Sequence, residues 1–326
     1  MNNQIVLQVE NLHTSFFTRQ GEIKVIDGVN FFVREGETLG IVGESGCGKT
    51  VTGLSIIRLL PEPAGKIVGG KILLDGTDLL KLSQKEMRQY RGKKITMILQ
   101  DPMTSLNPVY PIGDQIAESI RLHRGLSEDK VLEEVISTLK LLRIPAPQMR
   151  IRDYPFQLSG GMRQRVVGAI AMSCRPRLLI ADEPTTALDA TIQAQYIALF
   201  KDIQRETDVS IIFITHDFGV IANICHRVAV MYAGKIVETA RTRELFNNPQ
   251  HPYTIALMES VPRLERKTDR LYSIQGQPPS MANLPAGCRF LPRCANPVDF
   301  CGKQEPEETI IGDEHVVSCW KTWRKN

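Results

Sequence analysis

The residues best suited to chemistry form a glycine-rich run between an apolar strand and a helix. Residues 39–42 are apolar and typical of a short buried strand, and residues 49–60 have the pattern of a helix. Between them, residues 43–50 have the spacing Gly-x-x-x-x-Gly-Lys-Thr, which fits a phosphate-binding loop in the strand–loop–helix setting that this motif requires. The pattern predicts that the chain binds a nucleoside triphosphate. An ordinary glycine-rich turn before a helix is the alternative.

Each residue type in this loop has a physical role. The glycines let the backbone curl so that successive N–H groups face phosphate oxygens, and the following helix adds the positive end of its dipole. Lys49 is expected to neutralise the β- and γ-phosphates, and the Thr50 hydroxyl to bind Mg²⁺. The residues expected to contact the nucleotide here are Gly43, Glu44, Ser45, Gly46, Cys47, Gly48, Lys49, Thr50 and Val51.

Two adjacent carboxylates follow a second apolar strand. Residues 178–181 are entirely apolar, as in a central parallel strand, and they end in Asp182 and Glu183. Asp182 can hold Mg²⁺ directly or through water, and Glu183 can orient and deprotonate an attacking water. A strand that ends in solvated acids is the alternative.

Three further residues are candidates for the same site. Gln100 follows an apolar strand at 95–99, and His216 follows another at 211–215, where nucleotide-binding sheets place their ligands. Phe16 could stack on a nucleotide base, although a lone aromatic residue is as often part of the core.

A helical segment separates the glycine-rich loop from the carboxylates. Residues 112–123 and 127–142 have helical periodicity, which indicates a small helical subdomain inserted into an α/β core. Residues 158–162, Leu-Ser-Gly-Gly-Met, then lead directly into another helix. Serine and two glycines at a helix N-terminus can bind an anion, although by composition alone a helix cap is the simpler interpretation.

Length and composition limit the class of protein. A chain of 326 residues exceeds the usual size of one hydrophobic core, so we expect one large domain with an appendage. A net charge of +4 neither requires nor excludes nucleic acid or anionic lipid. No apolar run approaches the ~20 residues that span a bilayer, and residues 1–4 lack the features of a signal peptide. We therefore expect a cytoplasmic protein that reaches a membrane only through partners.

Together these segments resemble the ATP-binding cassette (ABC) family, over roughly residues 5–240. The matching motifs occur in the family's order: residues 43–50 resemble the Walker A loop, Gln100 the Q-loop, residues 158–162 the signature, Asp182 and Glu183 Walker B with the catalytic glutamate, residues 186–189 the D-loop, and His216 the switch histidine. One departure is Met162, where the commonest signature ends in Gln.

This resemblance implies a fold and a mechanism. The fold is an α/β P-loop NTPase core with an antiparallel β subdomain and a helical subdomain inserted at about 101–160. Two cassettes pair head to tail, and each ATP lies between one Walker A loop and the other subunit's signature. The implied roles are catalysis for Glu183, His216 and Gln100, magnesium binding for Thr50, Gln100 and Asp182, contact with ATP from the opposite subunit for Ser159, Gly160, Gly161 and Met162, and a D-loop contact for Asp189.

Four of the seven cysteines lie close together near the end of the chain, at Cys288, Cys294, Cys301 and Cys319. This stretch has few apolar residues, so a metal crosslink is a physical way to stabilise it. The spacings match neither the C-x-x-C knuckle of zinc sites nor the cysteine run of bacterial ferredoxins, which leaves zinc and iron–sulfur equally open and free thiols or a disulfide as the alternative.

The other three cysteines, Cys47, Cys174 and Cys225, are most simply packing residues. For Cys47 we also weigh a lowered pKa and a reactive thiol, because it lies at a helix N-terminus.

A narrower resemblance comes from His251-Pro252-Tyr253 and the four-cysteine tail. Both look like the dipeptide/oligopeptide permease ATPase subunits, and in one branch of these the tail is similar to one that holds a 4Fe–4S cluster. The resemblance implies an ABC ATPase domain at 1–240, a small irregular metal-binding extension at 241–326, and ATP hydrolysis that powers peptide import. It also implies partners: two transmembrane permease subunits, a second ATPase subunit (a paralogue or a second copy), and an extracytoplasmic substrate-binding protein, with this chain peripheral on the cytoplasmic membrane face.

Other functions stay open. Related importers carry nickel chelates or sugars. A soluble ABC ATPase acting on ribosomes or DNA typically has tandem cassettes or long coiled-coil insertions, and this chain has neither. Trp320 and Trp323 lie among Lys and Arg residues. The sequence has no sustained basic stripe of the kind that would predict nucleic-acid binding.

Overall fold

The computed structural model describes residues 4–100, 105–186, 189–260 and 273–323. The chain forms two compact units, and each is made of several segments. The helical unit contains residues 1–7, 32–38 and 73–214, and the loop unit contains residues 8–31, 39–72 and 215–326. Among the described residues, no helix combines the length and the apolar character that a bilayer span requires.

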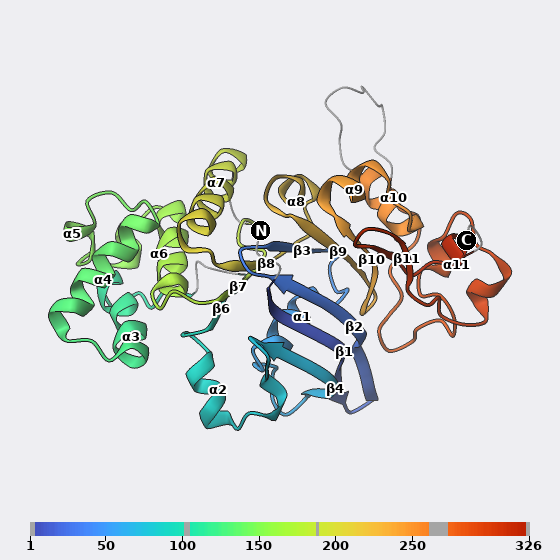
Figure 1. The fold of residues 1–326 in the computed structure, drawn as a ribbon, viewed down its shortest axis with the longest axis horizontal. Coiled ribbons are helices and arrows are strands. Elements are labelled where there is room, and N and C mark those ends of the chain that lie inside the picture. Colours follow the sequence, from blue (N-terminus) through green and yellow to red (C-terminus); the bar gives the residue numbers. More distant parts are fainter. Residues whose placement is uncertain (1–3, 101–104, 187–188, 261–272, 324–326) are drawn as a thin grey trace. The chain divides into compact units, whose positions relative to one another are not determined.

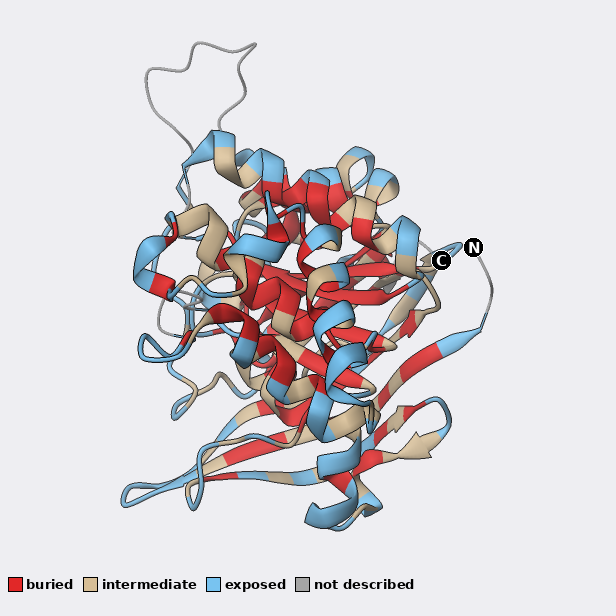
Figure 2. Cartoon of the chain, turned by 90° about the vertical axis from the view of Figure 1, so that its left-hand side faces the viewer, coloured by how far each residue is buried: buried red, intermediate tan, exposed pale blue. Residues whose placement is uncertain are grey.

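The helical unit is built on three parallel strands in the order β6, β7, β8. They are β6 (Ile95–Ile98), β7 (Leu178–Asp182) and β8 (Ser210–Thr215). Every residue of β7 and β8 is buried, as expected for parallel strands covered on both faces, and Figure 2 shows buried residues in red. In the register, Ile98 is paired with Ala181, so the carboxyl ends of β6 and β7 meet at one edge.

Helices make up most of this unit. Three of them, α3, α4 and α6, pack against one another (Figure 1). The helices are α2 (Gln84–Tyr90), α3 (Ile112–Arg124), α4 (Glu128–Leu141), α5 (Pro147–Arg150), α6 (Gly160–Met172) and α7 (Ala190–Thr207), with short 3₁₀ turns at Leu79–Lys81 and Pro155–Gln157. In α3, Ile112, Ile116 and Ile120 are buried at a spacing of four residues, which forms one apolar face. The helices predicted at 112–123 and 127–142 are confirmed.

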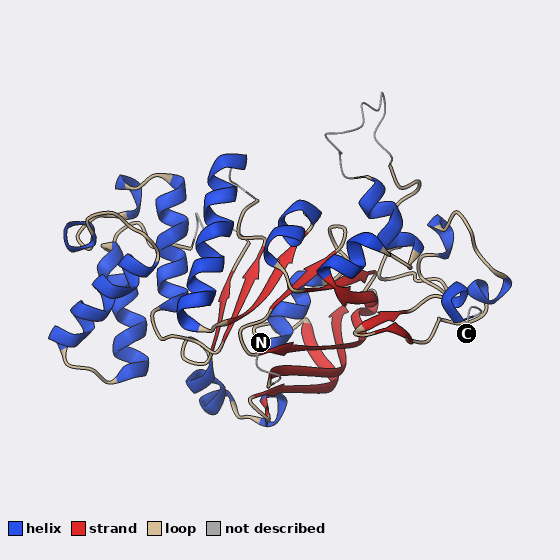
Figure 3. Ribbon diagram, turned by 45° about the horizontal axis from the view of Figure 1, so that its top comes forward, coloured by secondary structure: helices blue, strands red, loops and turns tan. Residues whose placement is uncertain are grey.

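The loop unit contains the N-terminal strands and the strand that carries the glycine-rich loop. Strands β1 (Ile5–Thr18), β2 (Gly21–Arg34) and β4 (Gly65–Leu74) lie in the order β2, β1, β4, and β4 is antiparallel to the two-residue β5 (Thr77–Asp78). Strand β3 (Thr38–Val42) is parallel to β9 (Arg227–Tyr232), which is antiparallel to β10 (Lys235–Arg241). Figure 3 shows these strands in red.

Helix α1 (Lys49–Ile56) is shorter than the predicted 49–60. The chain adopts a positive φ of 54° at Arg58, and prolines follow at 61 and 63, so the helix cannot continue. The other helices of this unit are α8 (Phe218–Ile224), α9 (Thr242–Asn247), α10 (Pro252–Glu259) and α11 (Trp320–Trp323), with 3₁₀ turns at Leu291–Arg293 and Asp299–Gly302.

The C-terminal extension is more regular than the sequence predicted. It contributes β11 (Thr309–Gly312) and β12 (His315–Val317), and β12 pairs with β10 through Glu238 and Val317, so the extension enlarges the sheet of the loop unit. The prediction of a small irregular C-terminal segment is therefore wrong at residues 309–317. These strands are short, and β11 alternates between half-buried and exposed residues, so they leave little periodic signal in the sequence.

A buried carboxylate holds this extension to β10. Glu238 is 1% exposed and accepts hydrogen bonds from the N–H groups of Gln250 and His251, at 2.8 and 2.9 Å. Its Oε1 also lies 2.8 Å from Nε2 of His315 on β12. One acid therefore satisfies donors from two separate segments of the extension.

We predict that His251 makes the loop unit sensitive to acid. Its Nδ1 accepts the N–H of Tyr253 at the start of α10, and burial lowers the pKa of His251 to about 4, against a smaller raising effect of Glu238. The unfolded chain binds the proton near pH ~6.5, so stability is lost as the pH falls below that value, by about 2–3 kcal/mol at pH 4.5.

The matched variant is His251→Asn, because asparagine also caps a helix but does not titrate. Denaturant unfolding can be followed by the fluorescence of Trp320 and Trp323, the chain's two tryptophans, both in the loop unit. The variant should lose less stability than the parent between pH 8 and 4.5. An identical loss in both proteins would contradict the role of His251.

Candidate functional site

The glycine-rich loop joins β3 to α1 and has the backbone conformation that its glycines permit. Gly46 and Gly48 have positive φ values of 78° and 109°, which other residues rarely adopt. A Cβ at Gly43 would lie 2.2 Å from the backbone carbonyl oxygen of Met231 on β9, so only glycine fits there. The loop therefore curls tightly against the end of β9.

Lys49 turns back into this curl. Its side chain is buried, and Nζ donates hydrogen bonds to the carbonyl oxygens of Gly43 and Glu44, at 2.8 and 2.9 Å. A buried ammonium requires such partners, because its desolvation is costly. Thr50 and Val51 are half-buried in the first turn of α1, and Ser45 and Gly46 are exposed at the tip of the loop.

Cys47 is buried in the loop, and burial raises the pKa of its thiol. The low pKa that its place at a helix N-terminus suggested is therefore wrong, because desolvation outweighs the charge of Lys49. Cys225 is buried and Cys174 is half-buried, and the Cys174 thiol donates to the carbonyl oxygen of Ser119. These positions agree with the prediction of packing residues.

Residues far along the chain hold the outside of the loop. The Glu44 N–H donates to the Tyr253 hydroxyl at 2.9 Å, and the Glu44 carboxylate accepts two hydrogen bonds from Arg293, at 2.6 and 2.9 Å. The N–H of Gly234 donates to the carbonyl oxygen of Cys47 at 2.8 Å. Sequence reasoning missed Arg293, which no motif marks, and it used Tyr253 only as a sign of the family.

The helical unit assembles the acidic residues by itself. Asp182 ends β7 and is fully buried. Glu183 has a positive φ of 45°, and its carboxylate accepts a hydrogen bond from the Thr186 hydroxyl at 2.9 Å and from the Gln100 side-chain amide at 3.5 Å. The edge formed by the ends of β6 and β7 thus brings together Gln100, Asp182 and Glu183, three residues that the sequence placed in one site.

The Ser-Gly-Gly segment begins α6 as a helix cap. Ser159 is the N-cap, and its Oγ accepts the N–H of Met162 at 3.4 Å. A Cβ at Gly160 would meet nothing within 4 Å, and at Gly161 it would meet only Ile192, at 3.3 Å. The backbone of this turn is therefore open to a close approach.

The remaining predicted residues have simple local settings. Asp189 caps α7 by accepting the N–H groups of Thr191 and Ile192. His216 follows β8 and is exposed, and Phe16 is half-buried on β1. Residues 187–188, in the predicted D-loop, and residues 101–104, at the start of the predicted helical subdomain, lie outside the described residues.

The four C-terminal cysteines lie near one another in the loop unit and are free thiols. Burial raises the pKa of Cys288 to about 11, and the charges of Cys301, Cys319 and Cys294 add to this shift. Backbone N–H groups of Phe290, Lys321 and Val298 point at the sulfurs of Cys288, Cys319 and Cys301, respectively. In the part of the chain that the structure describes, no group of three or more His, Cys, Asp or Glu side chains could hold a metal ion.

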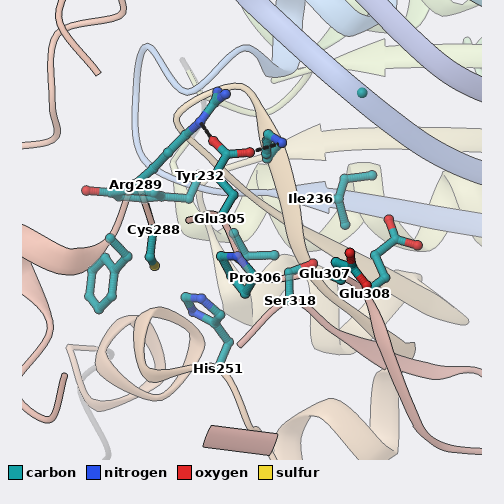
Figure 4. A pocket seen from close by; sticks show the side chains of 14 residues that line it. Tyr232, Ile236, His251, Cys288, Arg289, Glu305, Pro306, Glu307, Glu308 and Ser318 are labelled. Carbon is teal, nitrogen blue, oxygen red and sulfur yellow. Dashed lines mark hydrogen bonds and ion pairs between the residues drawn. The ribbon is translucent and has the colours of Figure 1, made fainter. Parts of the chain in front are cut away.

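A cavity of about 510 Å³ is lined by one of these cysteines, Cys288 (Figure 4). Cys288 and His251 line it together with Arg289, Glu305, Lys235 and Ser318. Within this wall, Glu305 pairs with both Arg289 and Lys235, and Arg289 also pairs with Asp27.

The chain has a phosphate loop at the start of a helix, a carboxylate pair at the end of a buried parallel strand, and a Ser-Gly-Gly helix cap. Together these features define an ATP-binding cassette. Two family descriptions match the chain: ABC transporter over residues 26–186, and oligopeptide/dipeptide transporter, C-terminal region, over residues 237–301.

Individual relatives agree. The chain is 52% identical to the dipeptide transport ATP-binding protein DppD of Bacillus subtilis, over 97% of this chain and 94% of that protein. It is 50% identical to the oligopeptide transport ATP-binding protein OppD of the same organism, over 97% and 88%. The dimeric structure of MJ0796, a bacterial ABC transporter cassette, matches with a TM-score of 0.64 and 26% identity, over 73% of this chain and 99% of that one. The chain belongs to the family of ATP-binding proteins of dipeptide and oligopeptide ABC transporters.

We predict that Gly43→Ala destabilises the nucleotide-free protein by about 1–3 kcal/mol, because the new methyl group overlaps the Met231 carbonyl. Gly46→Asn is the control, since a side chain there meets nothing within 4 Å and asparagine tolerates a positive φ. Denaturant unfolding measures both. Equal stability of Gly43→Ala and the parent would show that the loop does not need the observed curl.

Proposed function

We propose that this chain is the ATP-hydrolysing subunit of a membrane transporter that imports dipeptides or oligopeptides. The observation that carries the proposal is the curled loop around the buried Lys49, because it is built to receive phosphate groups. The names of the relatives matched along nearly the whole chain support the substrate class.

ATP binding is assigned to the loop and the start of α1. Backbone N–H groups of residues 43–50 would bind phosphate oxygens, and Lys49 would exchange its two carbonyl partners for the β- and γ-phosphates. Phe16 would stack on the base. The residues assigned to ATP are Phe16, Gly43, Glu44, Ser45, Gly46, Cys47, Gly48, Lys49, Thr50 and Val51.

Thr50, Gln100 and Asp182 would hold Mg²⁺. Hydroxyl, amide and carboxylate oxygens are the ligands that this ion prefers, and the fully buried Asp182 carboxylate suits a site next to a cation. When bound, Mg²⁺ neutralises charge on the β- and γ-phosphates.

Glu183 would act as the general base. The Thr186 hydroxyl and the Gln100 amide both donate to its Oε2, so the carboxylate is held in one orientation. A water placed in line with the γ-phosphate would transfer its proton to this carboxylate as it attacks. His216, at the end of β8, would contact the γ-phosphate.

Each chain supplies one phosphate loop and one signature, so we infer that two cassettes pair. Ser159, Gly160, Gly161 and Met162 would contact the ATP held by the opposite subunit, with Asp189 in the D-loop nearby. The MJ0796 cassette, which this chain resembles, is described as dimeric. The second cassette is a paralogue or a second copy of this chain.

The wider assembly follows from the proposed role. Two transmembrane permease subunits and an extracytoplasmic substrate-binding protein would complete it, with this chain on the cytoplasmic membrane face. The proposed division is an ABC ATPase domain at 1–240, with the helical subdomain at about 101–160, and an extension at 241–326.

We further propose that Cys288, Cys294, Cys301 and Cys319 hold a 4Fe–4S cluster, with zinc as the alternative. The support is that Cys294, Cys301 and Cys319 lie close enough to Cys288 to raise its pKa, and that backbone N–H groups point at three of the sulfurs. Such N–H groups stabilise thiolate ligands and tune iron–sulfur sites.

The function is tested by uptake of a labelled dipeptide into vesicles that contain the complete transporter. Glu183→Gln should keep ATP binding but slow hydrolysis about 10²–10⁴-fold and stop uptake, because the proton acceptor is lost. Lys49→Ala should instead weaken ATP binding. ATP hydrolysis at the parental rate in Glu183→Gln would refute the role of Glu183, and uptake of nickel chelates or sugars but no peptide would refute the substrate class.

The cluster is tested by metal analysis of anaerobically purified protein. We expect a brown protein with about four iron and four sulfide per chain, and we expect Cys301→Ser to lose the cluster while ATP binding persists. Colourless protein with one zinc per chain would overturn the cluster and assign zinc to the four cysteines. Metal-free protein with four titratable thiols would overturn both assignments.

A further inference from the structure

We propose that Arg293 is a positioning residue for the phosphate loop, and that through it the C-terminal extension contributes to the affinity for ATP. This inference rests on the proposed ATP site at the loop. It assigns a role to the C-terminal extension that the chemistry of ATP hydrolysis itself does not require.

The contact between Arg293 and the loop is buried and has two hydrogen bonds. The Arg293 side chain is 3% exposed, and its two terminal nitrogens donate to the two carboxylate oxygens of Glu44, at 2.6 and 2.9 Å. Such a planar fork fixes the orientation of a carboxylate as well as its distance. The guanidinium also lies 5.9 Å from the centre of the Tyr232 ring, which limits its other positions.

Glu44 is held at its backbone too, and its backbone holds Lys49. The N–H of Glu44 donates to Tyr253, while its carbonyl oxygen accepts from Nζ of Lys49. Freeing the Glu44 side chain would loosen the backbone of this residue, and its carbonyl oxygen would no longer be held in place next to the Lys49 ammonium. Arg293 therefore acts on the phosphate-binding lysine through one intervening residue.

Arg289 connects the same segment to the loop at a second place, through hydrogen bonds. It donates to the carbonyl oxygen of Ala233 at 2.6 Å, and the next residue, Gly234, donates its N–H to Cys47 of the loop. Both arginines lie on the stretch between two of the four cysteines, so one short segment touches the loop from two sides.

Backbone hydrogen bonds fix the stretch that carries Arg293. The N–H of Cys288 donates to the carbonyl oxygen of Cys301, and the carbonyl oxygen of Cys288 accepts the N–H of Leu291. The N–H of Arg293 donates to the carbonyl oxygen of Phe290 in the same turn. This turn therefore places the Arg293 side chain next to Glu44.

The test is a double-mutant cycle on ATP affinity in the full chain, measured by titration with a fluorescent ATP analogue and Mg²⁺. Arg293→Ala and Glu44→Gln should each weaken binding about tenfold, the usual worth of a charged hydrogen bond, and the double variant should be no weaker than either single one. Arg293→Lys should restore affinity only in part, because lysine cannot make the fork.

Two further measurements separate positioning from a general loss of structure. In ATP hydrolysis Arg293→Ala should raise KM and leave kcat near the parental value, because Arg293 orients the loop that binds ATP and is not the group that accepts the proton. Arg241→Ala is the matched control: its exposed pairs with Asp313 and Glu314 also join β10 to the extension, but they touch no loop residue, so ATP affinity should not change.

Parental affinity in both Arg293→Ala and Glu44→Gln would overturn the positioning role. If the parent itself fails to bind ATP, the proposed function fails. If the parent binds ATP and Lys49→Ala does not, an unchanged ATP affinity in Arg293→Ala overturns only this inference.

Discussion

The curl of the phosphate loop around a buried lysine is the constraint on which the rest of the loop unit depends. An ammonium group out of water costs several kcal/mol unless oxygen atoms surround it, and here the loop supplies two of its own carbonyls. The curl in turn needs glycine at Gly43, because the backbone of β9 passes too close for a side chain. This close approach follows from the parallel pairing of β3 with β9, which ends beside the loop.

The C-terminal extension is part of the same construction. Tyr253, Arg289 and Arg293 all donate hydrogen bonds to, or accept them from, the loop or the turn beside it. Glu238 ties the extension to β10 by satisfying buried donors of two segments. The extension therefore supports the nucleotide site of the loop unit, although it carries none of the motifs that mark a cassette.

The sequence predicted features that depend on local chemistry. The loop, the strands that end at Gln100 and Asp182, and the helices α3 and α4 follow from glycine spacing, apolar runs and helical periodicity, which act over a few residues. The Arg293–Glu44 pair joins residues 249 positions apart, and no local pattern encodes it. The strands β11 and β12 are too short for a periodic signal. For Cys47, helix position predicted a low pKa, but burial in the folded loop decides the direction.

The account is tested most directly by a structure of the full chain with a non-hydrolysable ATP analogue and Mg²⁺. It predicts that the phosphates lie in the curl of residues 43–50, that Lys49 Nζ has left the carbonyls of Gly43 and Glu44 for phosphate oxygens, and that Arg293 still pairs with Glu44. Phosphates bound elsewhere, or Lys49 unmoved beside a bound nucleotide, would contradict it.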